Sequence, residues 1–170
     1  MKAALALGCS LGDRRARMEE TLRRLDATPG LEWVRTSALV RTPPLRGGVA
    51  RGAFLNAVAL FHTDLSPHAL LEVCIGLEDA AGRRRARRWA DRTLDIDLLL
   101  VEGQTLRSEA LVLPHPAIAQ RAFVLEPLLE VWPEAIDPVS GRPWAELPRP
   151  PGPRPVRVGR VAPRRPLGYL

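Results

Sequence analysis

One short segment near the middle of the chain limits the folds that this sequence can adopt. Residues 94–101 read LDIDLLLV, an apolar run that carries two carboxylates. Alternate side chains of a β-strand share a face, so Asp95 and Asp97 are expected to point the same way, roughly 7 Å apart. The residues expected on the opposite face are Leu94, Ile96, Leu98 and Leu100. Two carboxylates that close repel each other, so their place in an apolar strand needs an explanation.

A divalent cation is one partner that would remove this repulsion. Mg²⁺ prefers one or two carboxylates, with water and substrate phosphate completing an octahedron. The alternative is structural: one aspartate is solvated on an edge strand and the other pairs with Arg92. A bare Asp-x-Asp pattern does not decide between the two.

A cluster of arginines leads into the same segment. Its members are Arg83, Arg84, Arg85, Arg87, Arg88 and Arg92, and Asp91 is the only acidic residue among them. Such a run is normally a solvated face or a nucleic-acid patch. Beside a carboxylate pair it favours another interpretation, in which phosphate oxygens contact a metal and guanidinium groups at once. Gly82 would let this segment close over a nucleotide, although the chain has neither a P-loop nor a Rossmann glycine fingerprint.

The net charge of +6 says little about function, because the charge is concentrated locally. The six charged residues after Glu146 are all arginines. Removing them from the 25 basic residues leaves 19, equal to the 19 acidic residues. The body is therefore neutral, and the basic character of the chain reflects its tail rather than a nucleic-acid-binding face.

Length and composition predict one domain followed by a tail. Residues 1–147 are expected to form the domain, and residues 148–170 are too rich in proline and arginine to pack a core, so we expect them to be extended or mobile. Cys9 and Cys74 are too few for a disulfide framework or a tetrahedral metal site. The apolar run at residues 3–7 is shorter than a signal-peptide core, and no stretch approaches a membrane span. We therefore expect a cytoplasmic protein that does not associate with membranes.

The order of apolar patterns and turn residues predicts the fold class. Strands are expected at residues 2–8, 31–41, 53–63 and 94–101, helices at residues 13–28 and 67–81 with a further short helix beginning near Pro127, and a hairpin or short excursion over residues 102–113. Ser66 is expected to cap the second helix, with Pro67 at its first position. This order favours an α+β fold with helices on an antiparallel or mixed sheet, which we expect to be mostly antiparallel, rather than a doubly wound parallel sheet.

Other residues suggest a pocket for a flat heterocycle. Phe54 and Asn56 would share a strand face, and the stiff loop over residues 42–45 is near them in sequence. The Phe54 ring would stack on the face of the heterocycle, and the Asn56 amide would form paired hydrogen bonds with its edge. The alternative places Phe54 in the core and Asn56 at the end of a hairpin. His115 lies between two prolines and is expected to be either a turn residue or a phosphate contact. Trp89 is expected either to cover a bound ring as a lid or to anchor the arginine segment.

Taken in order, these pieces resemble the 6-hydroxymethyl-7,8-dihydropterin pyrophosphokinase family over about residues 2–147. The matching residues are Gly8, Leu11-Gly12, Thr42-Pro43-Pro44-Leu45, Phe54-Leu55-Asn56, Glu78, Gly82-Arg83, Arg85, Trp89, Arg92-Thr93-Leu94-Asp95-Ile96-Asp97, Pro114-His115-Pro116, Arg121 and Phe123. The resemblance implies a ferredoxin-like fold, a central sheet flanked by helices. It also implies transfer of pyrophosphate from ATP to the pterin hydroxymethyl group with release of AMP.

The same resemblance implies a role for each matching residue. Two Mg²⁺ ions would be held by Asp95 and Asp97, and the catalytic residues would be Arg83, Arg92 and Asp97. ATP would contact Leu71, Glu78, Arg83, Arg85, Arg92, Leu98, His115 and Arg121. The pterin would contact Thr42, Pro43, Pro44, Leu45, Phe54, Asn56, Trp89 and Phe123.

The chain departs from the family pattern in three places. Cys9-Ser10 replaces a Ser-Asn pair in the glycine turn, Ala110 and Val112 replace a basic and a hydroxyl residue of some members, and the tail after Pro148 has no counterpart. Two rival functions remain at this stage, an RNA-binding module of similar fold and a metal-dependent phosphohydrolase. The expected partners are small molecules and not nucleic acid, and the chain is expected to be a monomer, with a weak dimer as the alternative.

Overall fold

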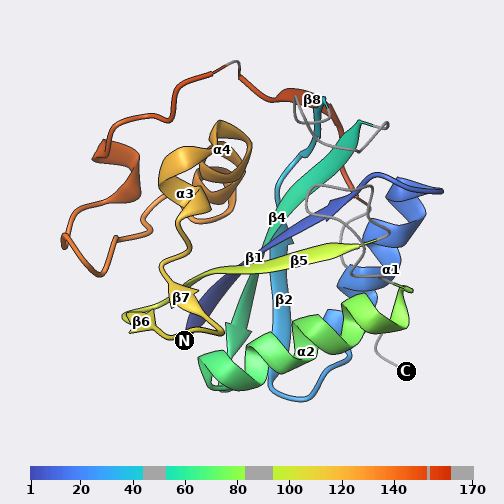
Figure 1. Cartoon of the computed structure of the whole chain (residues 1–170), viewed down its shortest axis with the longest axis horizontal. Helices are drawn as coiled ribbons and strands as arrows, with labels where there is room; N and C mark the ends of the chain where they lie inside the picture. The colour runs from blue at the N-terminus through green and yellow to red at the C-terminus, as the bar shows by residue number, and fades with distance from the viewer. Residues whose placement is uncertain (44–52, 83–93, 153, 162–170) are drawn as a thin grey trace, which may run out of the picture.

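The molecule is built on one antiparallel sheet, seen in a computed structural model that describes residues 1–43, 53–82, 94–152 and 154–161 (Figure 1). The strands follow the order β5-β1-β4-β3-β8, and β2 pairs with β4 beside β3. Their bounds are β1 Lys2–Cys9, β2 Leu31–Thr36, β3 Leu39–Thr42, β4 Phe54–Thr63, β5 Asp95–Val101 and β8 Val156–Gly159. Two further strands, β6 Leu106–Arg107 and β7 Val112–Leu113, form the hairpin expected after β5.

Helices pack on both faces of the sheet and define two cores (Figure 1). The helices are α1 Arg14–Asp26, α2 Pro67–Ala80, α3 Ala117–Gln120 and α4 Ala122–Val131, with a 3-10 turn at Trp144–Glu146. Apolar side chains of α1 and α2 join one core and those of α3 and α4 join the other. Ser66 caps α2 as predicted, since its hydroxyl accepts a hydrogen bond from the Ala69 N–H. The α+β class is therefore confirmed.

Two strands depart from the regular alternation that the sequence predicts. Residues 31–41 were expected to form one strand, but the chain breaks at residues 37–38 into β2 and β3. In β5 the register against β1 shifts, so that Leu5 pairs with Leu98 and Ala4 with Leu100. Leu99 is the extra residue of this bulge, and Leu100 joins the α4-side core instead of the face predicted for it.

The last helix begins earlier than predicted. Pro127 was expected near its start, but α4 begins at Ala122 and contains Pro127 in its interior. A proline there removes one helical hydrogen bond. The buried stripe of Val124, Leu125, Leu128 and Val131 gives α4 a core contact that outweighs this loss.

The tail adds a strand to the sheet. Its composition predicts an extended or mobile segment, draped on the body as one alternative, and residues 156–159 form the extended strand β8, which pairs antiparallel with β3. The prediction that the tail packs no core is wrong at Val161, which is 8% exposed and belongs to the core beside α1 and α2. An edge strand needs only backbone hydrogen bonds on one side, so composition is a poor guide to its formation.

Candidate active site

A cavity opens on the α4 side of the sheet, where apolar cover gives way to polar residues. The cover comes from residues such as Val58, Leu60 and Leu99, which pack beneath α3 and α4. Beyond them the same sheet face carries polar and small side chains around a cavity of about 300 Å³. The predicted site residues that line it are Thr42, Pro43, Phe54, Asn56, Asp95, Asp97, His115, Arg121 and Phe123. These residues are far apart in sequence, and the fold brings them together.

The two carboxylates of β5 share one wall of this cavity. Their partners across β1 are small, since Asp95 lies opposite Gly8 and Asp97 opposite Ala6. Both aspartates are half-buried. Small neighbours on the adjacent strand leave the space above the carboxylates open, so this wall is both acidic and accessible.

The donor set at this wall fits Mg²⁺. Oxygen ligands from one or two carboxylates, completed by water and phosphate, are what this cation takes in nucleotide enzymes. Within the described ranges no group of three or more His, Cys, Asp and Glu side chains forms a metal cluster. Among the described residues, the carboxylates that would hold such a cation are therefore Asp95 and Asp97.

Glu78 holds the backbone between the two carboxylates. Its Oε1 accepts a hydrogen bond of 2.7 Å from the Ile96 N–H, and the residue is only 5% exposed. Burial makes this contact strong because water does not compete for the N–H group. Glu78 thus lies behind the acidic wall, outside the set that lines the cavity, and fixes the strand that carries Asp95 and Asp97.

The opposite wall is formed by the ends of β3 and β4. The Asn56 side-chain amide donates a 3.0 Å hydrogen bond to the Thr42 hydroxyl, and Phe54 lies two residues earlier on the same strand face. A Cβ atom placed on Gly8 would lie 3.0 Å from the Asn56 Oδ1, closer than ordinary packing allows. The absence of a side chain at Gly8 therefore leaves room for the Asn56 amide.

His115 contributes a defined hydrogen-bond donor. Its Nδ1 accepts a 3.0 Å hydrogen bond from the Ala117 N–H, and its backbone N–H donates to the Leu99 carbonyl. A ring whose Nδ1 accepts carries its proton on Nε2. The imidazole is thereby held in one orientation, with Nε2–H as the group left to donate.

A cation and an aromatic ring complete the rim. Arg121 is exposed and its guanidinium lies 5.8 Å from the centre of the Phe123 ring. This distance is within the range of a cation–π contact, which orients the side chain without neutralising its charge. Arg121 and Phe123 therefore offer a positive group and a ring face to the cavity.

Several predicted residues lie elsewhere. Leu98 is 2% exposed and belongs to the core beside α2, and Leu71 is half-buried against the same core. Neither lines the cavity, and their predicted nucleotide contacts stay predictions. Six predicted site residues lie outside the described ranges, namely Pro44, Leu45, Arg83, Arg85, Trp89 and Arg92.

The positions that depart from the family pattern stand away from the cavity. Cys9 faces the opposite core, where its thiol donates to the Arg14 carbonyl, and burial raises its pKa to about 11. Ala110 is exposed and Val112 lies in β7. Two residues near the site were not predicted from the sequence. Ala6 lines the cavity, and Arg14 donates a 2.6 Å hydrogen bond to the carbonyl of Ala53, the first described residue after residue 43. The small residues of β1 were the available signal for Ala6.

The sequence is similar to known proteins over most of its length. The family model for 7,8-dihydro-6-hydroxymethylpterin-pyrophosphokinase matches residues 4–133. A 2-amino-4-hydroxy-6-hydroxymethyldihydropteridine pyrophosphokinase of Methylorubrum extorquens is 47% identical over 79% of this chain and 85% of its own length. The Bacillus subtilis protein of the same name is 35% identical over 76% and 77%.

Solved structures show the same fold at lower identity. Plasmodium falciparum HPPK-DHPS crystallised with pteroate aligns with a TM-score of 0.63 and 16% identity. The alignment covers 85% of this chain but 41% of the longer protein. At this identity the likeness concerns the fold alone, and it confirms the predicted ferredoxin-like arrangement. No helix among the described residues is both long and apolar enough to cross a membrane.

Proposed function

Because the chain belongs to the 7,8-dihydro-6-hydroxymethylpterin-pyrophosphokinase family, it transfers pyrophosphate from ATP to hydroxymethyldihydropterin in folate synthesis, and we propose which of its residues perform each part of that reaction. The observation that supports the assignment is the cavity itself, which has an amide and aromatic wall on one side and an acidic wall on the other. The two walls suit the two substrates.

The pterin binds at the wall formed by β3 and β4. A pterin ring presents a flat face and an edge of alternating donors and acceptors, which an aromatic ring and a side-chain amide recognise. Phe54 and Phe123 provide the ring faces, and Asn56 provides the amide, held by Thr42. Pro43 closes the end of this wall, and Pro44, Leu45 and Trp89 are proposed to complete it.

The ATP phosphates bind at the acidic wall. Asp95 and Asp97 would hold Mg²⁺, which when bound neutralises phosphate charge and orients the β-phosphoryl group. His115 Nε2–H and the Arg121 guanidinium donate to phosphate oxygens from the rim. Arg83, Arg85 and Arg92 are proposed to add further guanidinium groups, and Leu71, Glu78 and Leu98 lie behind the nucleotide.

Transfer then follows from positioning. The pterin hydroxyl oxygen attacks the β-phosphorus in line, the bond from that phosphorus to the α-bridging oxygen breaks, and AMP leaves while the hydroxyl proton is lost. Asp97, which lines the cavity, is proposed to orient the hydroxyl. Charge neutralisation and alignment provide most of the rate, as in other phosphoryl transfers.

Substitutions at the two walls test this division of roles. Asn56→Ala is expected to raise the KM for the pterin about tenfold or more with little change in the KM for ATP, since the side-chain amide that pairs with the pterin edge is lost. Asp97→Ala is expected to abolish Mg²⁺-dependent ATP binding in calorimetry. If Asn56→Ala changes the ATP KM instead, or Asp97→Ala binds Mg-ATP normally, the walls are assigned wrongly.

The remaining parts of the proposal concern the organisation of the protein. We propose a cytoplasmic monomer whose catalytic domain spans residues 1–147, with residues 148–170 as a tail and no nucleic-acid partner. Sedimentation tests the monomer. A salt titration of RNA binding with and without residues 149–170 tests the last point, because arginine–phosphate contacts weaken steeply with salt.

A further inference from the structure

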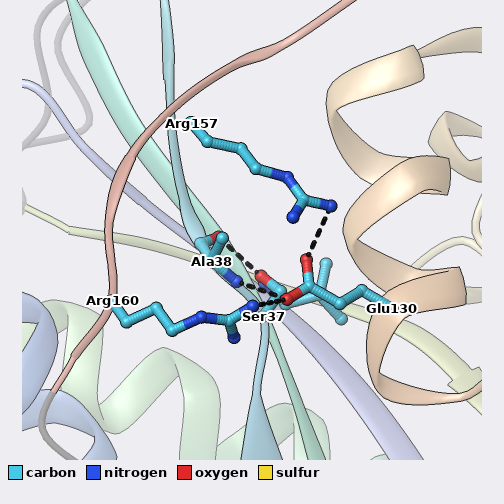
Figure 2. A network of polar contacts seen from close by, with 6 residues as sticks. Ser37, Ala38, Glu130, Arg157 and Arg160 are labelled. Carbon is cyan, nitrogen blue, oxygen red and sulfur yellow. Dashed lines mark hydrogen bonds and ion pairs between the residues drawn. The ribbon is translucent and has the colours of Figure 1, made fainter.

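The tail and the last helix meet at one carboxylate beside the break between β2 and β3. Figure 2 shows this contact, which we call the Glu130 junction and which consists of Ser37, Ala38, Glu130, Arg157 and Arg160. Glu130 belongs to α4, Arg157 belongs to β8, and Arg160 is the residue that follows β8. Three segments distant in sequence are therefore joined by a single side chain.

Each oxygen of Glu130 has a defined partner. Oε1 accepts a 3.1 Å hydrogen bond from the Ala38 N–H and a 2.6 Å contact from the Arg160 guanidinium. Oε2 lies 3.5 Å from the Arg157 guanidinium. The Glu130 side chain is 20% exposed, whereas those of the arginines are mostly exposed. Exposed ion pairs contribute little, so the hydrogen bond to the buried Ala38 backbone is the stronger constraint.

Ser37 fixes the same break from the other side. Its backbone N–H donates to the Val58 carbonyl, and its hydroxyl accepts a 3.0 Å hydrogen bond from the Val58 N–H. The same hydroxyl donates to the Ala38 carbonyl. Residues 37–38 therefore replace regular strand pairing with contacts to β4 and α4, and these contacts set where β3 begins.

β3 leads directly from this junction to the pterin wall. It is only four residues long, pairs with β4 on one side and β8 on the other, and ends at Thr42. Thr42 accepts the hydrogen bond from Asn56. A short strand has few contacts of its own, so the position of Thr42 depends on what holds the start of β3.

We propose that Glu130 is a positioning residue for the pterin, acting through the Ala38 N–H, β3 and the Thr42–Asn56 pair. This role rests on the proposed assignment of Asn56 to the pterin wall. The phosphate wall belongs to β5 and the segment around His115, which β3 does not contact in the pairing of the sheet. Loss of the junction therefore weakens pterin binding selectively.

The charge of Glu130 and its acceptor oxygen are separable. Glu130→Gln keeps an oxygen for the Ala38 N–H but removes the ion pairs with the arginines, whereas Glu130→Ala removes both. Because the backbone hydrogen bond is the main constraint, the glutamine variant is expected to retain pterin affinity. Glu126, one turn earlier on α4, is a matched control, because the hydrogen bonds and ion pairs of the junction among the described residues are made by Glu130.

The experiment measures steady-state kinetics of the full chain with each substrate varied in turn. Glu130→Ala is expected to raise the pterin KM about tenfold with the ATP KM changed less than about twofold, the pattern of displaced binding groups. Glu130→Gln and Glu126→Ala are expected to stay within about twofold of the unaltered protein for both substrates. If Glu130→Ala does not fold, Glu130→Asp, which retracts the carboxylate from Ala38, is expected to raise the pterin KM severalfold.

Other outcomes overturn the proposal. An unchanged pterin KM in a folded Glu130→Ala or Glu130→Asp variant contradicts it, as does an equal rise in both KM values, which marks a general loss of structure. A glutamine variant as impaired as the alanine variant contradicts the role of the backbone hydrogen bond. Asn56→Ala separates this failure from that of the site: if that variant loses pterin affinity and the Glu130 variants do not, only the positioning role is wrong.

Discussion

Replacing Glu78 tests how the acidic wall of the active site is held. Its Oε1 accepts the hydrogen bond from the Ile96 N–H at 2.7 Å, in a position where the residue is 5% exposed. Glu78→Ala leaves that buried donor without this acceptor, which costs about 1–3 kcal/mol, and the space left by the side chain adds to the cost. Helix propensity contributes little, because alanine and glutamate are both good helix formers. We therefore expect a loss of about 2–4 kcal/mol in the free energy of unfolding.

This loss has two measurable consequences. For a chain of this length the melting temperature falls roughly 2–4 °C per kcal/mol, so thermal unfolding should shift by roughly 5–15 °C. Ile96 lies between Asp95 and Asp97, so relaxation of its backbone displaces both carboxylates. A displacement near 1 Å costs about a hundredfold in rate, and we expect kcat/KM for ATP to fall by about ten- to a hundredfold.

The matched control is Glu78→Gln, which keeps an oxygen for the Ile96 N–H. It is expected to melt within a few degrees of the unaltered protein and to retain most of its activity. Thermal unfolding and steady-state kinetics measure these two quantities. An alanine variant with an unchanged melting temperature and an unchanged kcat/KM for ATP would refute the reasoning.

Three further predictions follow from single contacts. Gly8→Ala places a Cβ atom 3.0 Å from the Asn56 Oδ1. The resulting displacement of the amide is expected to raise the pterin KM about three- to tenfold, and an unchanged pterin KM contradicts the role given to Gly8. His115→Ala removes the Nε2–H donor and is expected to lower kcat/KM about ten- to a hundredfold, while His115→Gln, which keeps a donor, recovers part of the loss. Burial raises the pKa of Cys9 from 9.0 to about 11 and that of Cys74 from 9.0 to about 12. Above about pH 9 both thiols therefore stay protonated in the folded protein while those of the unfolded chain lose their protons. Urea titrations should therefore show the free energy of unfolding decreasing as pH rises above about 9, and a flat profile would contradict these shifts.

Local alternation predicted which side chains of the site share a strand face. Asp95 and Asp97 share a face because they lie two positions apart along the strand, and Phe54 and Asn56 share one for the same reason. All four line the cavity. The sequence alone left open whether these residues belong to one site, since that depends on the pairing of β5 and β4 with β1.

The features that the sequence did not predict depend on contacts between distant segments. The bulge at Leu99 arises from pairing with β1, and it moves Leu100 to the other face. The break at residues 37–38 is held by Val58 and Glu130, which lie far along the chain. Strand β8 forms in a Pro- and Arg-rich tail because β3 presents an edge to it. Composition and periodicity contain no information about such partners.

The most direct test of the central claim is the identity of the nucleotide product. The protein is incubated with ATP, Mg²⁺ and 6-hydroxymethyl-7,8-dihydropterin, and AMP and ADP are separated and quantified. The account predicts that AMP forms only when the pterin is present, and that its amount equals the amount of pterin diphosphate formed. ADP as the product, or AMP released at the same rate without the pterin, would contradict it.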